Sequence, residues 1–192
     1  MLKLTNIRKR FDDKLIFDGF SYTFQDQGIY LIRGESGVGK TTLLRMIAGL
    51  DKHFEGEIDG GGPQNVSFSF QEYRLFDSLT AIDNVLVALN APTSDDTDRA
   101  IALLSELGLT GADIHLHPNE LSGGMKLRVS IARAVMKDAP ILLLDEPTRE
   151  LDDRSAAAVL ALASRIAESK TVIIVTHDDY GSLLRSAIEI NL

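Results

Sequence analysis

The chain has 192 residues, and 44% of them are hydrophobic, which is enough for a single globular domain with a buried core. Its 28 acidic residues outnumber its 20 basic ones and give a net charge of −8, so we expect no nucleic-acid partner. Cysteine is absent, which excludes disulfides and thiolate metal sites. No apolar run approaches the roughly 20 residues of a membrane-spanning helix, so we expect no direct membrane insertion.

The N-terminal part of the chain is rich in segments with strand character. The four segments that are apolar or alternate in polarity are residues 2–7, 15–24, 29–32 and 66–70. A glycine-rich loop and an amphipathic helix ending near Gly49 follow the third segment. Residues 56–63 are predicted to be turn-rich because they contain three consecutive glycines and a proline.

The middle of the chain is predicted to be a helical lobe, at about residues 77–137. Apolar residues there recur at helical spacing, Ser94 is suited to cap a helix, and Gly108 is suited to end it. Beyond the lobe, the apolar runs 141–144 and 171–176 predict strands buried on both faces. The alanine-rich segment between them predicts the crossover helix that parallel strands require.

A phosphate-binding loop is predicted between the third strand segment and the first helix. The sequence matches G-x-x-x-x-G-K-[ST] at every fixed position. The glycines aim backbone N–H groups at phosphate oxygens ahead of a helix N-terminus, Lys40 reaches the β- and γ-phosphates, and Thr41 ligates Mg²⁺. A glycine-rich turn in an unrelated α/β domain is the alternative. The predicted nucleotide-binding loop comprises Gly34, Glu35, Ser36, Gly37, Val38, Gly39, Lys40, Thr41 and Thr42.

Two carboxylates follow the strand 141–144, at the edge of the sheet where α/β proteins bind ligands. Adjacent strand residues point to opposite sides, so the two groups are expected to have different roles. We assign Asp145 to the Mg²⁺ shell and Glu146 to the activation of an attacking water. A helix cap or a solvated acidic turn is the alternative, and the phosphate loop makes it the weaker one.

A second helix start carries the sequence Leu-Ser-Gly-Gly. Ser122 and the N–H groups of Gly123 and Gly124 form a second anion-binding helix N-terminus. Taken alone, the motif is more typical of an ordinary capped helix start than of a binding site.

These motifs, in this order over about residues 2–190, resemble the ATP-binding subunit of an ABC transporter. Residues 70–76, 79–85 and 121–125 are similar to importer ATPases for nitrate, sulfonate or taurine. The resemblance implies a head-to-tail homodimer in the ATP-bound state. In that pair Ser122 and Gly124 of one subunit face the γ-phosphate held by Lys40 of the other.

The resemblance also gives roles to three further residues. It implies that Gln71 senses Mg²⁺ and the attacking water, that His177 contacts the γ-phosphate, and that Phe11 stacks on adenine. It further implies that the segment after Gln71 lines a groove for a helix of the membrane subunit. Without the resemblance, a surface glutamine, an incidental histidine and a core phenylalanine are the simpler interpretations.

The sequence departs from the family pattern in the loop after the acidic pair. Arg149 and Glu150 stand where the family usually has small Ser and Ala residues. Because a bulky charged pair at a close subunit contact must find opposite charges or stay solvated, we expect a weak dimer.

The sequence therefore predicts one domain, residues 1–192, with an α/β P-loop NTPase core, a mostly parallel sheet, a small N-terminal antiparallel β-portion and an inserted helical lobe. We expect a Mg²⁺-dependent ATPase that drives a separate membrane-spanning permease from the cytoplasmic, inner face of the cell membrane. The alternative is a soluble ABC-type ATPase that drives a protein machine, such as iron–sulfur cluster assembly or DNA repair. The short spacing between Lys40 and Ser122 leaves no room for the long coiled coil of some such machines.

Overall fold

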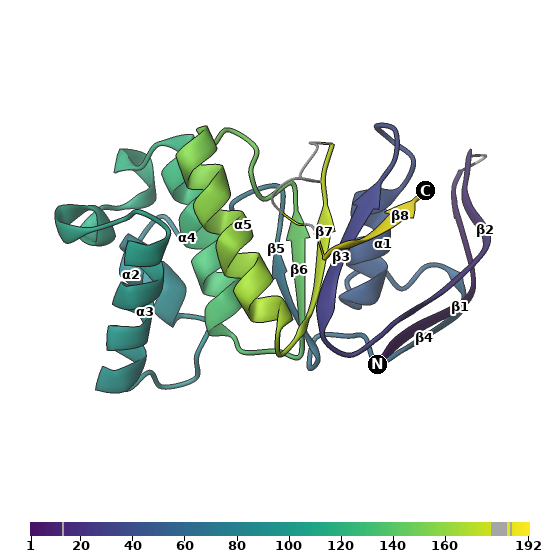
Figure 1. Ribbon diagram of the computed structural model, residues 1–192, viewed down its shortest axis with the longest axis horizontal. Coiled ribbons are helices and arrows are strands. Elements are labelled where there is room, and N and C mark those ends of the chain that lie inside the picture. The colour runs from purple at the N-terminus through teal and green to yellow at the C-terminus, as the bar shows by residue number, and fades with distance from the viewer. Residues whose placement is uncertain (13, 178–183, 185) are drawn as a thin grey trace.

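The computed structural model describes residues 1–12, 14–177, 184 and 186–192. Its N-terminal part forms an antiparallel sheet in the order β2-β1-β4 (Figure 1). The strands of this sheet are β1 (Leu2–Phe11), β2 (Lys14–Phe24) and β4 (Glu55–Asp59).

The central sheet is parallel and has the order β5-β6-β7-β3-β8. Its strands are β3 (Gly28–Arg33), β5 (Val66–Ser69), β6 (Ile141–Asp145), β7 (Thr171–Val175) and β8 (Ile188–Asn191). The side chains of β6 and β7 are buried along their whole length, as expected for strands covered on both faces.

Helices cover both faces of the central sheet and form a lobe on one side of it (Figure 1). The α-helices are α1 (Lys40–Ile47), α2 (Ala81–Leu86), α3 (Ser94–Glu106), α4 (Gly123–Met136) and α5 (Asp153–Ala167). Two short 3₁₀ helices, η1 (Gly111–His115) and η2 (Pro118–Glu120), lie between α3 and α4. Helices α2, α3 and α4 all fall within residues 77–137.

The alternation of side chains along β3 divides the core into two halves. Ile29 and Leu31 pack into a cluster with α4, α5 and the helical lobe. Tyr30 and Ile32 point to the opposite face and pack with α1 and the antiparallel sheet. The phosphate loop leaves the end of β3 between these two halves, so packing on both faces fixes its position.

The predicted fold class is confirmed, with three local corrections. Residues 55–59 form strand β4, where turn structure was predicted from residue 56 onwards. Helix α3 is capped by the Thr93 side chain, with Ser94 as its first residue. A further strand, β8, follows the one predicted at residues 171–176 and pairs with β3.

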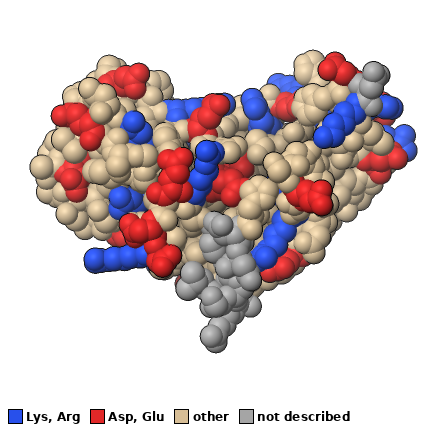
Figure 2. Space-filling model, turned by 90° about the horizontal axis from the view of Figure 1, so that it is seen from above, with Lys and Arg blue, Asp and Glu red and all other residues tan. Residues whose placement is uncertain are grey.

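The surface mixes charges of both signs. On the face seen in Figure 2, acidic and basic side chains of the described residues are interspersed. None of the helices in the described part of the chain has the length and apolar character needed to cross a bilayer.

Candidate functional site

The phosphate loop joins β3 to α1 at the carboxyl end of the parallel sheet. Gly39 precedes the helix with φ of 115°, and a Cβ there would overlap the side chain of Ile16, so only glycine fits. Lys40 is the first residue of α1 and is 6% exposed. Its Nζ donates to the carbonyls of Gly34 at 2.8 Å and Glu35 at 3.0 Å, which holds the ammonium over the loop.

A cavity of about 420 Å³ opens above this loop and brings together residues far apart in the sequence. The predicted site residues that line it are Phe11, Gln71, Glu146 and His177, with Ser36, Gly37, Gly39, Lys40, Thr41 and Thr42 of the loop. Gly34, Glu35, Val38 and Asp145 are not among the residues that line the cavity. Lys14, Ile16 and Val175 complete the lining and had no motif to reveal them.

Asp145 lies beneath the cavity at the end of β6 and is 2% exposed. Both of its carboxylate oxygens are buried, and beyond the hydroxyl of Thr41 no hydrogen-bonding partner for them is found among the described residues. Burial raises the pKa of this carboxyl above its ordinary value of 3.8, and the nearby Thr41 hydroxyl opposes the shift, while Glu146 adds to it. A buried carboxylate with unused lone pairs is suited to a cation.

The residues fit Mg²⁺ brought in by a nucleotide better than a metal held by protein alone. The described residues contain no cluster of three or more His, Cys, Asp or Glu side chains that could hold a metal. Proteins commonly bind Mg²⁺ through one or two carboxylates together with substrate phosphates. Asp145 and the hydroxyl of Thr41 would supply such a partial set of ligands.

Glu146 leaves the strand and turns toward the cavity. Its φ is 51°, a left-handed conformation that side chains of its size rarely adopt, and its N–H donates to the carbonyl of Val175 at 2.9 Å. The carboxylate is 13% exposed and meets His177, whose Nε2 lies 3.2 Å from Oε1. Asp145 and Glu146 therefore have separate environments, and the left-handed turn at Glu146, not the alternation of a strand, separates them.

Phe11 lines the cavity from the end of β1, and its side chain is 49% exposed. The Nζ of Lys9 lies 4.5 Å from the centroid of its ring. Lys9 is itself buried and paired with Asp51, with 2.7 Å between Nζ and Oδ2. A fixed cation thus supports the aromatic ring beside the cavity.

The Leu-Ser-Gly-Gly segment lies apart from this cavity. Helix α4 begins at Gly123, and the Oγ of Ser122 accepts the N–H of Met125 at 3.3 Å. Ser122, Gly123 and Gly124 do not belong to the cavity lining. Within one chain, the structure therefore does not bring the two predicted anion sites together.

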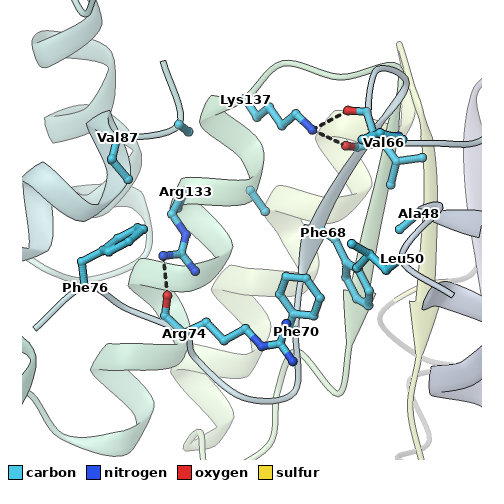
Figure 3. A pocket seen from close by; sticks show the side chains of 13 residues that line it. Ala48, Leu50, Val66, Phe68, Phe70, Arg74, Phe76, Val87, Arg133 and Lys137 are labelled. Carbon is cyan, nitrogen blue, oxygen red and sulfur yellow. Dashed lines mark hydrogen bonds between the residues drawn. The ribbon is translucent and has the colours of Figure 1, made fainter. Parts of the chain in front are cut away.

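A second hollow, also of about 420 Å³, lies between the helical lobe and the edge of the sheet (Figure 3). We call it the lobe groove. Its apolar lining includes Leu50, Phe76 and Val87, which are each about half exposed. Large exposed apolar side chains that gather in one hollow indicate a binding surface.

Three cations border the lobe groove, and no acidic residue is among the described residues that line it. Arg74 stacks over the Phe70 ring at 4.1 Å from its centroid. Arg133 donates to the carbonyls of Tyr73 and Arg74 at 2.9 and 2.7 Å. Lys137 donates to two backbone carbonyls on the far side of the groove (Figure 3).

Comparison with known proteins places the chain in a family. The family model described as ABC transporter matches residues 17–149. An aliphatic sulfonates import ATP-binding protein, SsuB 1 of Mesorhizobium japonicum, is 38% identical over 180 residues, which cover 90% of this chain and 68% of the relative. The macrolide export ATP-binding/permease protein MacB of Rhodopseudomonas palustris is 41% identical over 175 residues and covers 81% of this chain. The chain spans only 27% of the length of that relative.

The solved structures agree with this placement. The dimeric structure of a bacterial ABC transporter cassette has a TM-score of 0.86 and 29% identity, and the match covers 100% of this chain and 94% of that one. A dimeric post-hydrolysis structure of an ATP-binding cassette, bound to ADP and Pi, has a TM-score of 0.83 and 29% identity over 99% of this chain. The predicted family is confirmed: this chain belongs to the ABC transporter family, as one of its ATP-binding subunits.

Proposed function

We propose that this chain binds ATP with Mg²⁺ and hydrolyses it, through an ATP-dependent head-to-tail dimer, to drive a separate membrane-spanning permease. One observation carries the proposal. The cavity gathers the phosphate loop, Gln71, Glu146 and His177 from four separate segments, at the edge of the sheet where α/β proteins bind ligands. All four segments follow strands of the parallel sheet, β3, β5, β6 and β7, so the fold itself assembles the site.

The phosphate end of the site binds and orients the nucleotide. The backbone N–H groups of the loop and the N-terminus of α1 favour the negative phosphates. In the ligand-free chain the ammonium of Lys40 donates to the carbonyls of Gly34 and Glu35. When ATP binds, it would donate to β- and γ-phosphate oxygens in place of these carbonyls. Phe11 would stack on the adenine ring with Lys9 behind it.

The chemical step needs a base beside the γ-phosphate. The Glu146 carboxylate would accept a proton from the attacking water. His177 would orient that carboxylate, and His177 itself would also contact the γ-phosphate. The amide of Gln71 would orient the same water. Mg²⁺ bound with ATP supplies positive charge to the phosphate oxygens, and Asp145, Thr41 and Gln71 are the residues that we assign to it.

The dimer accounts for the second anion site. A lone chain leaves Ser122–Gly124 outside the cavity, and a head-to-tail partner would bring these residues to the γ-phosphate from the other side. ATP would then join the two subunits, and hydrolysis would release them. The solved relatives that are dimeric cassettes support this arrangement.

The lobe groove is the surface that we assign to the permease. Its exposed apolar side chains and its border of three cations fit a short amphipathic helix that presents an apolar face and a carboxylate. This docking would hold the chain on the cytoplasmic, inner face of the membrane. The names of the relatives include both import and export, so we assign no solute.

Copurification with the permease, followed by ATPase measurement on the purified complex, tests the proposal. We expect a membrane protein with several spans to be retained, and the complex to hydrolyse ATP only when Mg²⁺ is present. Retention of a cluster-assembly or DNA-repair complex would favour the protein-machine alternative. Failure of the isolated chain to bind ATP would overturn the assignment of the site.

A further inference from the structure

Glu150 lies against the start of helix α4, although it belongs to the loop that follows Glu146. A Cβ placed on Gly123 would be 2.5 Å from the Oε2 atom of Glu150, so the carboxylate touches the glycine backbone. A Cβ on Gly124 would be 3.2 Å from the backbone carbonyl of Glu150. The two glycines of the Leu-Ser-Gly-Gly motif are therefore covered by a residue of their own chain.

The Glu150 carboxylate is held in this position by Tyr73. The Tyr73 hydroxyl donates to Oε2 at 2.6 Å, across 77 residues of sequence. Burial, and then the hydrogen bond to Glu150, raise the pKa of Tyr73 above its ordinary value of 10, so the phenol keeps its proton at neutral pH. Arg149 adds a weaker contact, with its Nε 3.6 Å from Oε1.

The backbone of Glu150 lies in a tight turn beside α4. Its φ is 65°, a conformation in which a glutamate is strained, and the turn that contains it is closed by the N–H of Leu151, which donates to the carbonyl of Thr148. The turn directs the side chain toward α4 while Asp152 begins the next helix as its cap. The contact is thus held by backbone and side chain together.

The start of α4 attracts negative charge, because the first N–H groups of a helix carry a partial positive charge. The first turn of α4 contains no acidic residue of its own, and the Glu150 carboxylate lies beside its first residue, Gly123. In the proposed dimer, the γ-phosphate on the other subunit needs the same place. Two anions cannot share one helix N-terminus without strong repulsion.

We propose that Glu150 is an internal substitute for the γ-phosphate, and that the Tyr73–Glu150 hydrogen bond keeps it over Gly123 until ATP on a second subunit displaces it. This inference rests on the proposed function and adds a mechanism that regulates dimer formation. It deepens the expectation from the sequence that Arg149 and Glu150 weaken the dimer, because the structure gives Glu150 a specific position in competition with ATP.

A set of variants in the Glu146→Gln background tests this inference, because slow hydrolysis preserves the ATP-bound dimer. Glu150→Gln removes the charge and keeps the shape of the side chain, while Tyr73→Phe removes only the hydroxyl. Sedimentation with saturating ATP and Mg²⁺ would measure the dimer dissociation constant of each variant. We expect Glu150→Gln to tighten the dimer about tenfold, and Tyr73→Phe to tighten it less. Tyr73→Phe should add nothing once Glu150→Gln is present.

Glu168→Gln is the matched control, because it removes the same charge from an exposed position at the end of α5. An equal effect of Glu168→Gln and Glu150→Gln would overturn the inference in favour of general charge repulsion. The inference would also be overturned if Glu150→Gln left the dimer dissociation constant unchanged or raised it. It would likewise be overturned if the chain bound ATP but stayed monomeric with either glutamate or glutamine at position 150. Loss of ATP binding by the parent protein is a different result and would refute the proposed function instead.

Discussion

Glu146 and His177 meet through both oxygens of the carboxylate. The imidazole Nε2 of His177 lies 3.2 Å from Oε1 of Glu146, and the backbone N–H of His177 donates to Oε2 of Glu146 at 3.4 Å. One residue at the end of β7 thus fixes the orientation of another at the end of β6. Since these strands are neighbours in the parallel sheet, the contact depends on their register and not on a flexible loop.

Glu146→Gln should lower kcat by about 10²- to 10⁴-fold, because the amide cannot accept a proton from water. ATP affinity should change little, since we assign phosphate binding to the loop and Lys40. Steady-state phosphate release and nucleotide titration would measure the two effects separately. A variant that retains most of its turnover would show that another group is the base.

Lys40→Ala should weaken ATP binding by about 10²-fold or more, because it removes a charge-assisted contact to two phosphate groups. Calorimetric titration with ATP and Mg²⁺ would measure the affinity. Lys3→Ala, at an exposed position on β1, removes the same charge away from the cavity and should leave binding intact. Equal affinities for the two variants would contradict the phosphate-loop assignment.

Asp145→Asn should raise the stability of the ligand-free protein by about 1–3 kcal/mol, because burying a carboxylate away from water is costly. The stabilisation that Mg²⁺-ATP adds should be largely lost in the same variant. Thermal unfolding with and without Mg²⁺-ATP would measure both changes. Asp98→Asn, an exposed substitution on α3, should alter neither.

The same carboxylate predicts a pH dependence of the ligand-free protein. Burial raises the pKa of Asp145 above 3.8, so the folded state binds its proton more tightly than the unfolded state does. The contribution of Asp145 to stability is therefore greatest below pH 3.8 and falls as the pH rises through the raised pKa. Subtracting the profile of Asp145→Asn from that of the parent would isolate this contribution, and a difference that grows more stabilising with pH would contradict it.

Phe76→Asp should reduce copurification of the permease at least tenfold, because it places a charge in the apolar lining of the lobe groove. ATP binding by the isolated chain should remain, since Phe76 lies outside the nucleotide cavity. Ile101→Asp is the control: Ile101 is also an exposed apolar residue, but it lies on α3 and does not line the groove. Equal retention with both variants would place the permease elsewhere.

The sequence was sufficient for the parts of the site that are contiguous. The phosphate loop occupies neighbouring residues, and the pair Asp145 and Glu146 directly follows an apolar strand, so short patterns reveal both. Strand β4 was not predicted, because Glu55–Asp59 is acidic and contains glycine, which are features untypical of strands. Its pairing with β1, a partner about fifty residues away, overrides the local preference for turn structure.

Local sequence patterns could not predict contacts between residues that are far apart in the sequence. Nothing near Tyr73 in the sequence indicates a hydrogen bond to Glu150, because the bond exists only once α4, β5 and β6 have packed together. The sequence singled out Arg149 and Glu150 as a departure from the family pattern. It could not show that Glu150 covers a glycine of its own chain.

The hydrogen bonds of Arg133 have a mechanical consequence. The Arg133 guanidinium on α4 donates to two successive backbone carbonyls in the segment after Gln71. Because the guanidinium is planar and uses two donors, it opposes both rotation and separation of that segment relative to α4. We therefore expect that segment and α4 to move together as one unit. A push delivered at the groove would reach the opposite end of α4 as a displacement, instead of being absorbed by a yielding loop.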